Sequence, residues 1–182
     1  LAALFCTTVC LPAMAQYPDI PAADQRRSDS LMEAGRKHSD SAWQLAWHII
    51  QEDARKGKPY IPFAAKPEDL PQADIPAFPG AEGGGKFSFG GRGGKVFVVT
   101  NLDDDGPGSL RWACEQGGAR IVVFNVSGII RIKTPLIIRA PYITIAGHTA
   151  PGAGVCVAGE SVWINTHDVI IRYMRFRRGE TW

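Results

Sequence analysis

Four arginines lie within seven residues in the segment VIIRYMRFRRG, close to the last residue of the chain. Guanidinium groups pair with carboxylates through two parallel hydrogen bonds, so such a row suits an anionic polymer outside the cell. The alternative is a solvated strand edge with local salt bridges, the usual fate of surface charge. The candidate substrate-binding residues are Arg172, Arg175, Arg177 and Arg178.

Two other segments resemble ligand sites but lack the required chemistry. Gly80, Gly85 and Lys86 have the spacing of a phosphate-binding loop, yet Phe87 replaces the Ser or Thr that would hold magnesium. The segment NLDDDG begins like a calcium loop, but Trp112 stands where the bidentate Glu belongs. We therefore assign no metal ligand and read NLDDDG as a turn before a short helix, residues 110–116, that Ser109 caps.

The first fifteen residues are typical of an exported protein. They carry no charge, are mostly apolar and end in Ala13-Met14-Ala15, the small-x-small pattern of a signal peptidase site, although the basic start is missing. The run is too short to span a bilayer. We expect cleavage after Ala15, a secreted protein (periplasmic or extracellular) and no membrane association afterwards. Export and a net charge of only +2 argue against a nucleic-acid partner.

Cysteine usage leaves two alternatives open. Cys6 and Cys10 would leave with the signal peptide, and no CxxC pair exists. Cys114 and Cys156 either form a disulfide, which export permits, or remain two buried free thiols.

Residues 16–79 read as a helical and proline-rich extension. Residues 28–56 predict one or two helices, with Ser39 or Asp40 as a possible N-cap, and a row of Trp43, Trp47 and Ile50 that docks on the main body. Six prolines between residues 59 and 79 predict an extended strap over the surface, because proline fixes φ and removes a donor. The strap's apolar residues are expected to be buried: Tyr60, Ile61, Phe63, Leu70, Ile75 and Phe78.

Residues 80–182 read as an all-β domain. Short β-branched runs follow one another, and the main ones begin at Val96, Ile121, Ile143 and Val169, at intervals of 25, 22 and 26 residues. Such a period predicts a solenoid, whose open end the short helix would cap. A switch in the parity of apolar residues predicts a bend near Tyr173.

A set of motifs then resembles a known family. In order they are AFPGAEGGG, GGRGGKVFVVTNL, DGPGSLRWA, RIVVFNVSGII, ITIAGHTAPG and DVIIRYMRFRRG. Together they are similar to the pectate lyase family of polysaccharide lyases, over residues 77–179. The resemblance implies a right-handed parallel β-helix, a single-stranded solenoid, that is secreted and monomeric. It also implies cleavage of polygalacturonate, an anionic plant polysaccharide, by Ca²⁺-assisted β-elimination with an arginine as base.

The same resemblance places the catalytic residues outside this chain. In the family, the calcium carboxylates and the arginine base follow the strand that matches VIIRYMRF, so we expect them beyond Trp182. No catalytic or metal residue is therefore assigned, and the chain reads as an N-terminal fragment that is inactive alone. Two other functions stay open: a non-catalytic β-helix that binds polysaccharide or mediates adhesion, and a β-helix hydrolase or esterase acting on pectin, which would need paired carboxylates.

Overall fold

The computed structural model describes residues 19–179, and the expected signal peptide with its cleavage site lies outside the described residues. Two α-helices, two short 3₁₀ helices and nine strands are seen in this range. They are α1 (Ala22–Arg55), η1 (Pro67–Asp69), β1 (Lys95–Val99), α2 (Leu110–Glu115), β2 (Arg120–Phe124), β3 (Gly128–Ile132), β4 (Leu136–Ile138), β5 (Ile143–Ala146), η2 (Gly147–Thr149), β6 (Val155–Gly159), β7 (Val162–Ile164), β8 (Val169–Arg172) and β9 (Arg175–Arg178).

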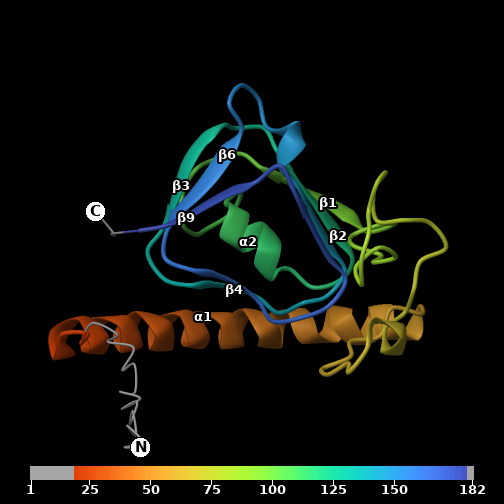
Figure 1. Ribbon diagram of the computed structural model, residues 1–182, viewed down its shortest axis with the longest axis horizontal. Helices are drawn as coiled ribbons and strands as arrows, with labels where there is room; N and C mark the ends of the chain where they lie inside the picture. The colour runs from red at the N-terminus through yellow and green to blue at the C-terminus, as the bar shows by residue number, and fades with distance from the viewer. Residues whose placement is uncertain (1–18, 180–182) are drawn as a thin grey trace, which may run out of the picture.

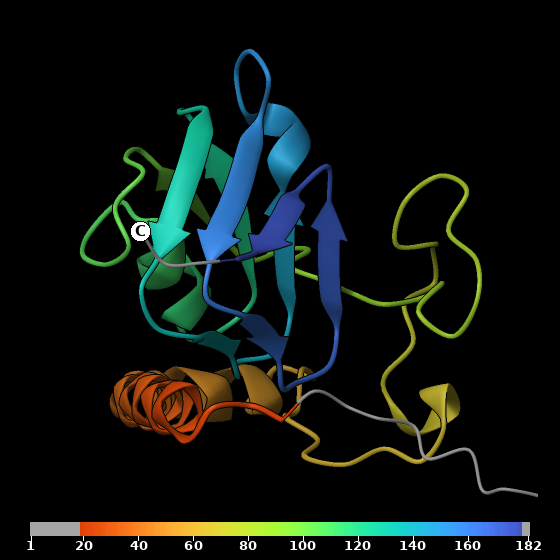
Figure 2. The same cartoon turned by 60° about the vertical axis from the view of Figure 1, so that its left-hand side comes forward.

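The strands form three sheets in which every pairing is parallel. The sheets have the orders β1-β2-β5-β8, β3-β6-β9 and β4-β7. Val96 pairs with Ile121, which pairs with Thr144, so the chain returns to the same sheet at nearly the interval that the sequence predicts. Viewed in Figure 1, the sheets enclose a triangular outline, and Figure 2 shows successive strands stacked side by side.

The core fills the space between the three sheets. In β2 the side chains alternate, with Arg120, Val122 and Phe124 buried and the two residues between them half-buried. Ile130, Ile138 and Ile143, one from each sheet, are wholly buried in the same cluster. β-Branched side chains suit such a strand because they pack well on a pleated surface.

Sharp corners separate the strands. Tyr142, Asp168 and Tyr173 are the non-glycine residues with positive φ among residues 19–179, at 59°, 55° and 57°. Tyr142 directly precedes β5 and Asp168 directly precedes the paired strand β8. Tyr173 lies between β8 and β9, which confirms the bend predicted there from the parity switch.

The short helix α2 closes one end of the core. The Ser109 hydroxyl accepts a hydrogen bond from the Trp112 N–H at 3.1 Å, so the predicted N-cap is confirmed. Leu110, Ala113 and Cys114 are at most 1% exposed and pack among the strands. Figure 1 shows α2 within the triangular outline. The helix ends one residue earlier than predicted, at Glu115.

The expectation of an all-β fold is wrong for the chain as a whole, because α1 is a continuous helix of 34 residues. The expected N-caps, Ser39 and Asp40, lie inside it. Ser39 is buried at 3% exposure, and Asp40 pairs with Arg139. These tertiary contacts hold both residues in helical conformation, although their side chains favour caps in isolation.

One face of α1 docks on the main body beside β4, as Figure 1 shows. Ala46 and Ile50 are buried with Ala140, and the Arg139 guanidinium lies 5.0 Å from the centre of the Trp43 ring. The predicted docking row is only partly buried, because Trp47 is 40% exposed. Its ring meets Tyr60 of the strap edge to face instead.

The proline-rich strap, residues 59–79, contacts the residues around β8 and is less buried than expected. The prediction of burial is wrong for Phe63 and Ile75, which are 80% and 62% exposed, and correct only in part for the other four, which are half-buried. A turn of 3₁₀ helix, η1, interrupts the strap.

The two cysteines within the described residues are free thiols. Cys114 is buried in α2 and Cys156 is half-buried in β6. Of the two alternatives left open by the sequence, the structure therefore has the unpaired one.

Candidate functional site

The four candidate arginines lie on the last two strands but do not form one cluster. Arg172 ends β8, and its guanidinium stacks 4.5 Å from the centre of the Phe78 ring in the strap. The other three, Arg175, Arg177 and Arg178, lie on β9 and are exposed. Because side chains alternate along a strand, Arg175 and Arg177 share one face of β9 and Arg178 projects to the other.

These arginines are not used to neutralise carboxylates within the described part of the chain. Arg175 donates to the Ala153 carbonyl at 2.6 Å, and Arg177 donates to the Phe176 carbonyl at 3.2 Å. Across residues 19–179, none of the four takes part in an ion pair. Their charge is therefore available to an acidic ligand.

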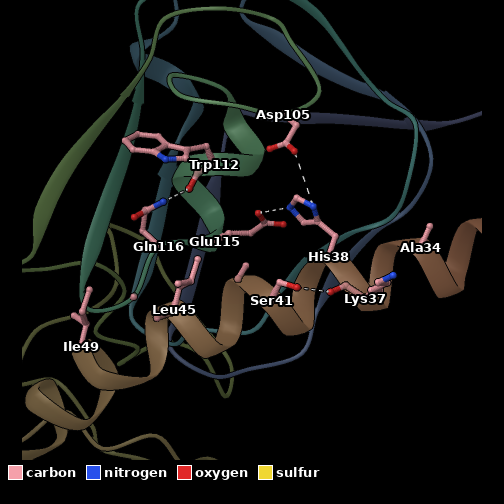
Figure 3. A pocket seen from close by; sticks show the side chains of 13 residues that line it. Ala34, Lys37, His38, Ser41, Leu45, Ile49, Asp105, Trp112, Glu115 and Gln116 are labelled. Atoms are coloured by element: carbon pink, nitrogen blue, oxygen red, sulfur yellow. Dashed lines mark hydrogen bonds and ion pairs between the residues drawn. The ribbon is translucent and has the colours of Figure 1, made fainter.

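A groove that sequence reasoning missed runs between α1 and α2, with a volume of about 630 Å³ (Figure 3). Apolar side chains line much of it, including Leu45 and Ile49 from α1 and Trp112 from α2. Polar groups meet toward one end of it, where His38 of α1 points toward Glu115 of α2 (Figure 3).

The polar end of the groove holds three ionisable side chains. His38 Nε2 lies 2.8 Å from Glu115 Oε2, and His38 Nδ1 lies 3.9 Å from Asp105 Oδ2. Burial raises the pKa of Glu115 above its ordinary value, and the hydrogen bond with His38 opposes that rise. Glu115 Oε1 is buried and accepts no hydrogen bond, although Arg111 Nη1 lies 3.9 Å away.

No local spacing in the sequence announces this cluster, because His38 and Glu115 are 77 residues apart. Asp105 drew attention only as part of a calcium-like loop, and that loop is a structural turn, as predicted. The Asn101 side chain accepts from the Asp103 N–H at 3.2 Å, and Asp104 is bound to Arg111 at 2.8 Å.

A second set of side chains has the residue types of a catalytic triad but not its arrangement. Ser88 donates to Asp168 Oδ1 at 3.3 Å rather than to His167. His167 Nε2 already accepts the Ile61 N–H at 2.9 Å, and Nδ1 lies 2.8 Å from Asp168 Oδ2. With both ring nitrogens engaged, His167 cannot serve as a base for Ser88. The set fastens the strap and the glycine-rich segment, residues 80–94, to the corner before β8.

Comparison with curated proteins finds relatives for part of the chain. It is 52% identical over 105 residues to a protein of Aspergillus flavus named "Probable pectate lyase C", and equally similar to its namesake in Aspergillus oryzae. A protein of Cryptomeria japonica named "Pectate lyase 1" is 35% identical over 85 residues, 42% of this chain and 22% of that protein. No protein-family model matches the chain.

The resemblance seen in the motifs is thereby confirmed over the matched residues, which make up 57% of the chain. Over these residues the chain is similar to proteins named pectate lyase. The chain spans about a quarter of the length of the first two relatives.

Proposed function

We propose that this chain is part of a secreted polysaccharide lyase that cleaves polygalacturonate or a similar uronate polymer by β-elimination. The observation that carries the proposal is the 52% identity, over 105 residues, to proteins named pectate lyase C. The three parallel sheets around one core support a further part of it, namely that the coils belong to a right-handed parallel β-helix. Within residues 19–179 no helix has both the length and the apolar character needed to cross a membrane.

Calcium does not fit the residues described here. The ion prefers six to eight oxygen ligands, mostly carboxylates and carbonyls. The one group of potential metal ligands within residues 19–179 includes an imidazole, and Asp104 of the acidic turn is already bound to Arg111. We therefore derive no step through calcium and assign neither its ligands nor the catalytic base to a described residue.

The role that we propose for the described residues is substrate binding by Arg175, Arg177 and Arg178. Their guanidinium groups are exposed on β9 and form no ion pair with a carboxylate of residues 19–179, so they suit the regularly spaced carboxylates of a uronate polymer. Exposed pairs contribute ~0.2–1 kcal/mol each, so three of them correspond to an affinity difference of roughly 3–150-fold. Arg172 would contribute less, because its guanidinium is stacked on Phe78.

Calorimetric titration of the chain with oligogalacturonate tests this role. We expect Arg175→Gln, Arg177→Gln and Arg178→Gln, combined, to weaken binding by that factor. The matched control replaces Arg26, Arg36 and Arg55, which are exposed on α1, and removes the same charge. Equal losses in the two triple variants would show a non-specific charge effect and overturn the assignment.

Catalysis is tested on the longer protein that contains this chain. Polygalacturonate with Ca²⁺ should give an unsaturated product, seen as a rise in ultraviolet absorbance, and chelation should abolish it. New reducing ends without that absorbance would indicate a hydrolase instead. Binding without any cleavage would indicate an adhesion or carbohydrate-binding protein, and either result would overturn the proposed lyase.

A further inference from the structure

We propose that His38, Asp105 and Glu115 bind a divalent transition-metal ion, which we take to be Zn²⁺, at the polar end of the groove between α1 and α2. One nitrogen or oxygen atom from each of the three side chains lies within 4.8 Å of the others. The inference concerns a different part of the molecule from β9 and does not depend on the proposed lyase activity.

The distances suit a small ion. Zinc bonds to imidazole nitrogen and carboxylate oxygen are about 2.0–2.2 Å long, so tetrahedral neighbours are roughly 3.3 Å apart. His38 Nε2 and Glu115 Oε2 are 2.8 Å apart and need to separate only slightly. Asp105 Oδ2 lies 3.9 Å from the other ring nitrogen, Nδ1, so its carboxylate has to turn toward Nε2 to join the same ion; its side chain is 56% exposed on the 101–109 turn.

A second observation points to a ligand, and it concerns Glu115. Its side chain is 9% exposed and directed into the groove, yet Oε1 accepts no hydrogen bond (Figure 3). Arg111, which lies 3.9 Å from that oxygen, is already engaged by Asp104 and by the carbonyls of Thr134 and Pro135. A buried carboxylate oxygen that accepts no hydrogen bond is costly, even with a guanidinium 3.9 Å away, and a bound cation would reduce that cost.

The donor set selects the class of metal. An imidazole with two carboxylates suits Zn²⁺ and its neighbours in the transition series, whereas Ca²⁺ and Mg²⁺ prefer oxygen alone. Three protein ligands leave a fourth position, which water from the open groove can fill. The two carboxylates balance the charge of the ion; Lys37 also lines the groove, and Arg111 Nη1 lies 3.9 Å from Glu115 Oε1.

The position of the site gives it a structural role. His38 belongs to the N-terminal helix, Glu115 to the helix that closes the core, and Asp105 to the turn before it. An ion bound by all three would fasten α1 to the closed end of the coils. Metal binding is then thermodynamically linked to the docking of α1, so zinc must stabilise the folded chain by mass action.

The test uses the full chain without a polyhistidine tag, freed of metal by chelation. Zn²⁺ affinity is measured by calorimetry, and thermal unfolding is followed with and without Zn²⁺. His38→Gln is the informative variant, because glutamine can still hydrogen-bond to Glu115 but is a poor ligand for Zn²⁺. His48→Gln is the matched control, since His48 is exposed on the same helix. Co²⁺ in place of Zn²⁺ reports the geometry through its visible absorption.

We expect one Zn²⁺ per chain, a melting temperature that rises with Zn²⁺, and a Co²⁺ spectrum of tetrahedral intensity. His38→Gln should weaken binding at least ~10–100-fold, the loss caused even by outer partners of metal ligands, and Asp105→Asn should weaken it as well. His48→Gln should bind as the unmodified chain does. No stoichiometric binding, equal binding by His38→Gln, or tighter binding of Ca²⁺ than of Zn²⁺ would each overturn the proposal.

Discussion

Arg120 offers the sharpest test of how the closed end of the core is held together. Its guanidinium is wholly buried at the start of β2, and no carboxylate pairs with it within the described residues. Instead it donates five hydrogen bonds to five backbone carbonyls, the full capacity of an arginine side chain. The acceptors are Ala113 at 3.3 Å, Cys114 at 2.6 Å, Gly118 at 3.0 Å, Ala140 at 3.2 Å and Pro141 at 3.1 Å.

Two of these acceptors explain why the contact matters for α2. Ala113 and Cys114 lie in the last turn of that helix, where carbonyls have no partner within the helix. A cation at this end also opposes the negative pole of the helix dipole. Burial lowers the pKa of Arg120 to about 10, which leaves the group charged at neutral pH.

The perturbation that we choose is Arg120→Lys, which keeps the charge but reduces five donors to three. At least two buried carbonyls then lose their partner, at a cost of ~1–3 kcal/mol each. The expected loss in the free energy of unfolding is therefore about 2–6 kcal/mol, a large share of the ~5–15 kcal/mol typical of a folded domain.

Urea unfolding followed by tryptophan fluorescence measures this loss, because Trp112 of α2 packs edge to face on Phe97 of β1. Arg131→Lys is the control, since Arg131 is exposed on β3 and should change stability by less than ~0.5 kcal/mol. If Arg120→Lys also stays within ~0.5 kcal/mol, water must satisfy the freed carbonyls, and our reasoning about this arginine is refuted.

Three further predictions concern the same part of the molecule. A Cβ atom at Gly91 would lie 1.8 Å from the Arg120 carbonyl oxygen. Gly91→Ala should therefore lower the free energy of unfolding by ~1–3 kcal/mol, seen as a lower urea midpoint. Gly85→Ala meets nothing within 4 Å and should be nearly neutral; equal effects would contradict the close approach. Burial raises the pKa of Cys114 to about 12, so at pH 8 its thiolate fraction is about 10⁻⁴. Iodoacetamide should label Cys156 but reach Cys114 only in urea, as peptide mapping would reveal; labelling of both thiols in the folded chain would argue against a closed end. Ser109→Ala should cost ~1 kcal/mol by removing the α2 cap, whereas a stability equal to that of the parent chain would mean that the hydroxyl is replaceable by water.

The sequence predicts the main strands well because each of them meets the same requirement. Every strand needs β-branched residues facing one core, so the runs from Val96 onward recur at the interval at which the chain returns to the same parallel sheet. The bend at Tyr173 is readable for the same reason, since a change of parity must reverse the faces. The N-cap Ser109 is a local signal and needs no knowledge of distant contacts.

What the sequence does not predict depends on contacts between distant segments. A predicted β strand that begins at Ile121 gives no reason to place Arg120 in the core, because its partners are backbone carbonyls of α2 and of neighbouring turns rather than side chains. The pairing of His38 with Glu115 likewise exists only after α1 has docked. The arginines of β9 are visible in the sequence, but whether they meet a uronate polymer depends on a partner that lies outside the fold.

The corner before β8 also imposes an order on folding. His167 accepts the N–H of Ile61, 106 residues earlier, and Asp168 accepts the N–H of Phe89, 79 residues earlier. At about 5–20 residues per second, synthesis takes roughly 5–20 s to pass from Ile61 to His167. During that interval the strap and the glycine-rich segment lack their anchors. The N-terminal part of this chain is made first but reaches its final position late. Until its anchors form, the strap is most vulnerable to proteases.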